Sequence, residues 1–130
     1  MAGENLDLVK STFDVFARGD LDEIRALLAD DLIVHRPEPD GAVYHGPDGF
    51  FQATAEWTED FEDWTYTPVE FLDAGESVAV KVHQTATGAQ SGVPVESDIW
   101  FVYTVRDGKV ARLSFHLRQE EALEAAGLPT

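Results

Sequence analysis

Four polar side chains that could do chemistry gather around one loop: Arg36, Glu38, Tyr44 and His45. An arginine can hold a carboxylate or phenolate ligand with paired hydrogen bonds. A tyrosine hydroxyl can donate to a developing oxyanion, and histidine has an intrinsic pKa suited to proton transfer. Glu38 would act as a base only if burial raised its pKa, and the nearby Arg36 opposes that rise. These four are candidate catalytic residues; the alternative is a solvated ion pair in a loop that only closes the fold.

The elements that position this loop change from helical patterns to strand patterns along the chain. Apolar spacings of three and four predict two early helices, the second one opened by Asp20, and Pro47 fits the first turn of a third. Residues 37–46 read as a loop. A single α+β domain over residues 1–130 is expected. The predicted strands are 31–36, 64–72, 77–87, 95–105 and 110–117, and a last short helix covers 119–126.

Alternation along the last two strands assigns each side chain to one face of the sheet. Phe101 and Tyr103 fall on the predicted inner face, and so do Ala111 and Phe115 on the following strand. Asp98 has the opposite parity and is expected on the outer face. A register shift of one residue would reverse every assignment, and Asp98 would then be the best general-base candidate inside the cavity.

Two apolar residues of the outer face, Trp100 and Val102, indicate a second buried surface. A sheet-to-sheet homodimer would supply that surface, and an isologous interface is the commonest arrangement. His116 shares this face and would meet the partner subunit. We therefore expect a homodimer through the outer face of the sheet.

Aromatic side chains on the predicted inner faces suggest a binding site. Ordinary core packing is the alternative for each ring, but a few polar tips among many rings describe a site for a flat apolar ligand. Trp57 and Phe61 are expected on the inner face of the third helix. The predicted ligand-binding residues are Phe13, Phe16, Trp57, Phe61, Phe101, Tyr103 and Phe115.

Composition restricts the possible partners. The formal charge is −16, which repels phosphate backbones and anionic lipid, so neither nucleic acid nor membrane is expected as a partner. The absence of cysteine excludes disulfides, thiolate nucleophiles and cysteine-bound metals. Neither a zinc-type histidine pair nor a phosphate-cradling glycine loop occurs, so we predict no metal and no cofactor. Without a membrane-length apolar run or an N-terminal signal pattern, a cytoplasmic protein is expected.

Four short stretches together carry a family resemblance. They are Arg18–Asp22, Asp31–Pro37, Tyr44–Phe50 and Arg106–Val110. In this order and spacing the chain resembles the SnoaL-like branch of the nuclear transport factor 2-like superfamily over nearly its whole length. The resemblance implies a cone-shaped, cystatin-like α+β fold, with helices packed in a strongly curved antiparallel sheet and an apolar cavity at the wide end. Members include ketosteroid isomerases, limonene-epoxide hydrolases, polyketide cyclases and non-catalytic modules, so the fold does not decide function.

Three positions depart from the catalytic patterns of that family. The isomerases place a carboxylate base before a proline at the end of the first strand, where this chain has Arg36. A guanidinium does not act as a base at neutral pH. The carboxylic acid on the isomerases' penultimate strand corresponds to Phe101, and the last-strand aspartate of the epoxide hydrolases corresponds to Phe115. The resemblance therefore transfers neither mechanism.

Two functions stay open at this point. A cofactor-free enzyme would isomerise, cyclise or hydrate an apolar cyclic compound. Arg36 and Tyr44 would polarise an oxygen, and Glu38 or His45 would move the proton. A non-catalytic module would instead bind a hydrophobic ligand or dimerise. The missing carboxylates favour the module, and the polar cluster in the loop favours the enzyme.

Overall fold

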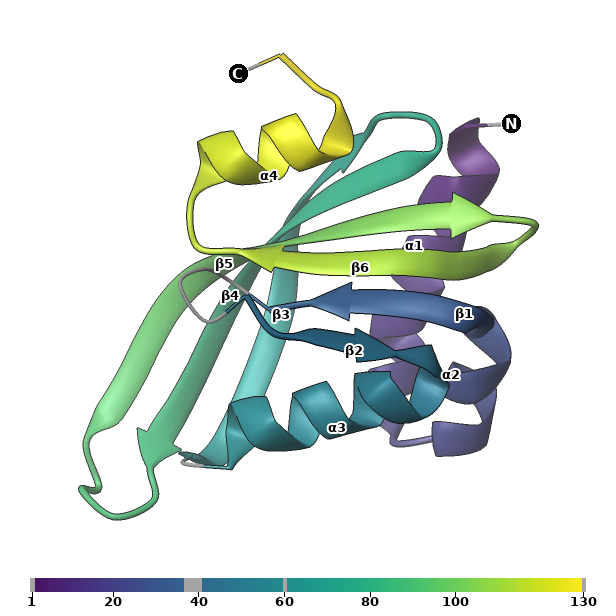
Figure 1. The fold of residues 1–130 in the computed structure, drawn as a ribbon. Helices are drawn as coiled ribbons and strands as arrows, with labels where there is room; N and C mark the ends of the chain where they lie inside the picture. Colours follow the sequence, from purple (N-terminus) through teal and green to yellow (C-terminus); the bar gives the residue numbers. More distant parts are fainter. Residues whose placement is uncertain (1, 37–40, 60, 130) are drawn as a thin grey trace.

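The computed structural model describes residues 2–36, 41–59 and 61–129, apart from the side chains of Ala2 and Trp57 (Figure 1). Four helices and six strands make up this part of the chain. In sequence order they are α1 (Ala2–Arg18), α2 (Leu21–Leu27), β1 (Leu28–His35), β2 (Val43–His45), α3 (Gly46–Thr58), β3 (Phe61–Asp73), β4 (Ser77–Gly88), β5 (Pro94–Arg106), β6 (Lys109–His116) and α4 (Gln119–Ala126).

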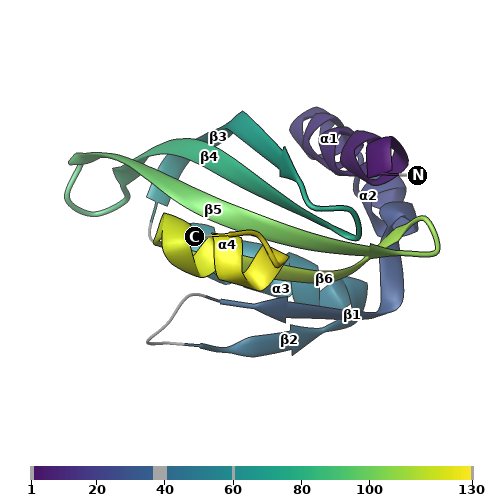
Figure 2. The same cartoon turned by 90° about the horizontal axis from the view of Figure 1, so that it is seen from above.

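One curved sheet contains all six strands, in the order β2-β1-β6-β5-β4-β3. The α+β cone expected from the sequence is confirmed, but the sheet is mixed because β1 runs parallel to β6. Helices α1, α2 and α3 pack on the concave side, whereas α4 lies on the opposite face over β5 and β6 (Figure 2). None of the described helices is long and apolar enough to span a bilayer.

Local signals in the sequence form the turns that bring the helices into place. Gly19 ends α1 with a φ of 73°, a left-handed conformation that glycine adopts without strain. The Asp20 carboxylate then accepts a hydrogen bond from the Glu23 backbone N–H at 3.1 Å and caps α2, as predicted. Pro47 lies in the first turn of α3, also as predicted. Strand β2 was missed, because its three residues lie in a segment that reads as a loop.

A bulge corrects the predicted faces of β6. Thr104 pairs with Arg112 and Val105 with Val110, so Ala111 is the extra residue. Val110 rather than Ala111 therefore points into the core, where it is fully buried. The simple alternation that the sequence predicts holds only for Leu113 and Phe115, because Leu117, also predicted on the inner face, follows the end of β6 and is exposed.

Two apolar cores lie on opposite faces of the sheet. The larger core joins α1, α2 and α3 to the concave face and contains Phe101 and Tyr103. The smaller core contains Trp100 and Val102 beneath α4. The second buried surface predicted from these two residues exists, but the chain's own last helix covers it. Trp100 and Val102 therefore no longer support a homodimer, which remains a prediction.

Candidate functional site

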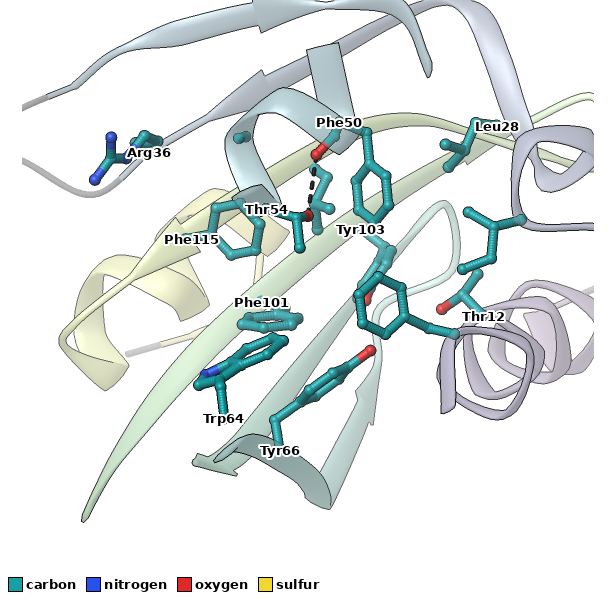
Figure 3. A pocket seen from close by; sticks show the side chains of 14 residues that line it. Thr12, Leu28, Arg36, Phe50, Thr54, Trp64, Tyr66, Phe101, Tyr103 and Phe115 are labelled. Atoms are coloured by element: carbon teal, nitrogen blue, oxygen red, sulfur yellow. Dashed lines mark hydrogen bonds between the residues drawn. The ribbon is translucent and has the colours of Figure 1, made fainter. Parts of the chain in front are cut away.

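A cavity of about 60 Å³ lies between the concave face of the sheet and helices α1 and α3 (Figure 3). One water needs about 10–15 Å³, so the cavity has room for only a few waters. Its walls are mainly aromatic and aliphatic. The lining residues are Thr12, Phe16, Ile24, Leu28, Arg36, Phe50, Ala53, Thr54, Trp64, Tyr66, Phe101, Tyr103, Leu113 and Phe115.

Polar groups lie at the two ends of this cavity. Arg36 is at one end, and Thr12 with the hydroxyls of Tyr66 and Tyr103 is at the other (Figure 3). Burial raises the pKa of Tyr66, and the neighbouring Tyr103 adds to the rise. Burial also raises the pKa of Tyr103, although its hydrogen bond with Thr12 opposes the rise. Both phenols therefore stay protonated at physiological pH and can donate hydrogen bonds to a ligand oxygen.

Most of the predicted binding aromatics that the structure describes line the cavity. Phe16, Phe101, Tyr103 and Phe115 do so. Trp57 belongs to α3, but its side chain is not described.

Phe13 and Phe61 are the two that do not line it. Phe13 is a core residue whose ring lies 6.0 Å from that of Phe101, between ring centroids. The helical position predicted for Phe61 is wrong, because this residue begins strand β3 and pairs with Gly88. Its side chain therefore belongs to the sheet rather than to the inner face of α3.

Two cavity residues on β3, Trp64 and Tyr66, were not among the binding residues predicted from the sequence. Their rings are stacked with centroids 4.8 Å apart. Register shifts on both sides of this segment interrupt the alternation, and Asp63 takes a positive φ of 51°. A period of two therefore could not assign their faces, although their clustered aromatic character was a usable signal.

The structure separates the three polar candidates of the loop that it describes. Arg36 lines the cavity, but the Tyr44 hydroxyl donates to Glu56 Oε1 at 3.2 Å and Tyr44 does not line it. His45 is exposed at the residue preceding α3. Glu38 lies outside the described residues. Only Arg36 is thus brought to the cavity among the three described candidates.

Glu56 is a polar residue that the sequence analysis did not single out. It extends from α3 toward β2, where it accepts the Tyr44 hydrogen bond. Its second oxygen, Oε2, is buried and has no hydrogen-bond partner among the described residues. A buried carboxylate oxygen of this kind is costly unless something else compensates it. Glu56 is therefore an additional candidate, next to the cavity wall formed by its own helix.

Asp98 lies on the outer face of β5, as the predicted register requires. Its carboxylate contacts His83 Nδ1 at 2.7 Å and Lys81 Nζ at 3.9 Å. The alternative in which Asp98 enters the cavity is excluded by this arrangement. The fourteen lining residues include no carboxylate, so the described walls offer hydrogen-bond donors but no ordinary base.

We expect the cluster around His83 to make stability depend on pH. The hydrogen bond to Asp98 raises the pKa of His83, and Glu96 contributes in the same direction. The stabilisation is therefore fully present below the unfolded-state pKa of about 6.5 and is lost as pH rises through the higher folded-state pKa. The stability difference between the wild type and His83→Gln should shrink between pH 6 and pH 8.

Urea unfolding at low ionic strength measures this difference, because salt screens partly exposed pairs. Thr85→Val, a change on the same face of β4, serves as the control and should show no such trend. A wild-type advantage over His83→Gln that grows with pH would contradict the assignment.

The fold and the cavity together define a nuclear transport factor 2-like protein. The model of the SnoaL-like domain matches residues 9–113, so the chain belongs to this family, as the resemblance implied. Within the described residues, no group of three His, Cys, Asp or Glu side chains is placed to hold a metal ion.

Solved structures share the architecture. An NTF2-like protein from Burkholderia xenovorans LB400 is 28% identical over 95% of both chains, with a TM-score of 0.75. IdmH from Streptomyces antibioticus, a proposed polyketide cyclase, is 22% identical over 94% of this chain and 96% of its own, with a TM-score of 0.72. TerC, co-crystallized with polyporic acid, is 20% identical over 95% of this chain and 98% of its own, with a TM-score of 0.76. No curated protein matches.

Proposed function

We propose that this SnoaL-like protein binds a small, flat, apolar cyclic compound in its cavity. A carbonyl or hydroxyl oxygen of that compound would face Tyr66 and Tyr103. The observation that carries the proposal is a ring-lined cavity whose described polar groups donate hydrogen bonds at both ends. Such a site favours a compound with an apolar body and acceptor oxygens.

The end of the cavity that contains Tyr66 and Tyr103 favours a neutral or weakly charged ligand oxygen. Two phenols that remain protonated can both donate to one oxygen, and their low-dielectric surroundings strengthen each hydrogen bond. Arg36 at the other end suits a second, more acidic oxygen. A ligand with oxygens at opposite ends of a flat ring system would use both.

The size of the cavity implies that its walls move when a ligand binds. A cavity of roughly 150 Å³ holds benzene in an engineered protein, whereas this one measures about 60 Å³. Lining rings must therefore rotate apart to admit a cyclic compound. The lining rings that are only partly buried, Trp64 and Phe115 among them, are the ones we expect to move.

A thermal-shift panel tests the binding function, since a ligand of the native state raises the melting temperature. The panel contains polyporic acid, prompted by the TerC structure, together with a steroid ketone and a terpenoid ketone. We expect at least one compound to bind, and Tyr66→Phe to weaken it about 2–10-fold through loss of one hydrogen bond.

Tyr44→Phe removes the same atom from a tyrosine outside the cavity wall and is the matched control. It should leave the affinity unchanged. Equal effects of the two variants, or the same affinity in Tyr66→Phe as in the wild type, would contradict the proposed ligand position.

A cofactor-free isomerase or cyclase is the second candidate function. Glu56 favours it, because its buried Oε2 has no hydrogen-bond partner in the described chain. Glu56 does not line the cavity, so it would accept a proton only after the wall movement proposed above brings a ligand within its reach. The protonated tyrosines would then stabilise the enolate oxygen that develops. Product formation from a bound panel compound would select the enzyme, and binding without product formation would select the binding protein.

A further inference from the structure

A second hollow lies on the opposite face of the sheet, beside α4. Its volume is about 510 Å³, within the range of roughly 300–1,000 Å³ typical of small-molecule sites. It shares only Arg36 and Phe115 with the cavity described above. We call it the outer groove. It is lined by His35, Arg36, Val102, Thr104, Arg112, Ser114, Phe115, His116, Glu121 and Ala125.

The outer groove concentrates basic groups in a strongly acidic protein. The chain has 25 acidic and nine basic residues and four histidines. Two arginines and two histidines line this groove, against one acidic residue, Glu121. The local balance of charge is thus opposite to that of the whole chain. An anion approaching the protein would be attracted here more than to the acidic surface.

Arg112 contacts a histidine, whereas four other arginines pair with carboxylates. Its Nη2 lies 3.0 Å from His35 Nε2, and it forms no ion pair with a described carboxylate. A guanidinium has no acceptor, so Arg112 is the donor and His35 Nε2 accepts. The positive charge of Arg112 is consequently not neutralised by an acid. Carboxylates pair with Arg18, Arg25, Arg106 and Arg118.

Ser114 and His116 add neutral hydrogen-bonding groups to the floor of the groove. Ser114 is only 7% exposed, and its hydroxyl lies 2.7 Å from His116 Nε2. Burial lowers the pKa of His116, so the imidazole is neutral at physiological pH. The groove therefore presents the Arg112 guanidinium, which pairs with no described carboxylate, beside groups that hydrogen-bond without adding charge. Arg36 and Glu121, which have opposite charges, also line it.

We propose that the outer groove is a binding site for a small organic monocarboxylate, held by Arg112. A guanidinium binds a carboxylate through two parallel hydrogen bonds. Two arginines against one glutamate leave the lining with a local excess of one positive charge, which in a protein of net charge −16 suits a monoanion better than a multiply charged ligand. Val102 and Ala125 give the groove an apolar wall for the body of the ligand.

Benzoate is the probe for this site, followed by NMR chemical shifts and calorimetry in low-chloride buffer with the full chain. We expect saturable binding that shifts resonances of Ser114 and His116. Arg112→Gln should weaken the affinity by at least about tenfold, since it removes charge-assisted hydrogen bonds. Arg118→Gln is the matched control, because Arg118 pairs with Glu120 outside the groove and its loss should leave the affinity unchanged.

Four results would overturn the proposal. The first is no benzoate binding at millimolar concentration, or equal binding by Arg112→Gln and the wild type. The second is tighter binding of inorganic phosphate than of benzoate, which would assign the groove to another anion. The third is a dimer in sedimentation that Arg112→Gln dissociates, because the groove would then be covered by a second copy. Perturbation of Tyr66 in place of Ser114 would place benzoate in the inner cavity and also count against the proposal.

Discussion

Replacing Phe101 with alanine should lower the free energy of unfolding by about 3–5 kcal/mol. Phe101 lies at the centre of the ring cluster that forms both the core and the cavity wall. Its ring centroid is 4.8 Å from that of Phe115, 6.0 Å from Phe13 and 6.1 Å from Tyr66. Removal of the ring loses these contacts and leaves a hole that the rigid sheet cannot close. Denaturant unfolding measures the change.

Leu117→Ala provides the comparison for this experiment. Leu117 follows β6 and is 56% exposed, so its truncation should change stability by no more than about 0.5 kcal/mol. A loss below about 1 kcal/mol for Phe101→Ala would mean that the ring does not fill the interior as the structure places it. A folded Phe101→Ala protein should also admit larger compounds, because the cavity widens where the ring was.

Replacing Ala122 with aspartate should detach α4 from the sheet and destabilise the protein by about 2–4 kcal/mol. Ala122 is fully buried against Trp100 and Val102. A carboxylate there would be taken out of water without a partner, and such burial is among the most costly of single changes. Amide hydrogen exchange in residues 119–126 should accelerate together with the loss of stability.

Ala125→Asp makes the same chemical change on the exposed side of the same helix and should cost little. Equal stability of the two variants would show that α4 does not cover the outer face. The Ala122→Asp protein also tests self-association. If the exposed Trp100 surface drives pairing, sedimentation should show a dimer in this variant at concentrations where the wild type is monomeric.

Strand patterns made the inner face of β5 predictable. Phe101 and Tyr103 point to the helices and Asp98 points away, because successive side chains of a strand alternate whatever the rest of the fold does. The caps of the early helices were equally predictable, since Gly19 and Asp20 act on backbone groups within a few residues. The family resemblance extended these local inferences to the α+β cone.

The site itself could be predicted only in part. Arg36 lines the cavity, whereas the Tyr44 hydroxyl donates a hydrogen bond to Glu56. No sequence pattern in the loop predicts which of the two side chains enters the cavity. Bulges in β3 hid the positions of Trp64 and Tyr66, because one extra residue reverses every later assignment.

The sequence by itself determined most of the helices and strands, the parity of the regular strands and the acidic, cysteine-free character of the chain. Tertiary structure alone decided that α4 covers Trp100 and that Arg112 meets His35, which lies 77 residues away. The physical reason is the range of the interactions. Periodicity and capping depend on neighbours within one or two turns, whereas contacts across the sheet depend on how the whole chain packs.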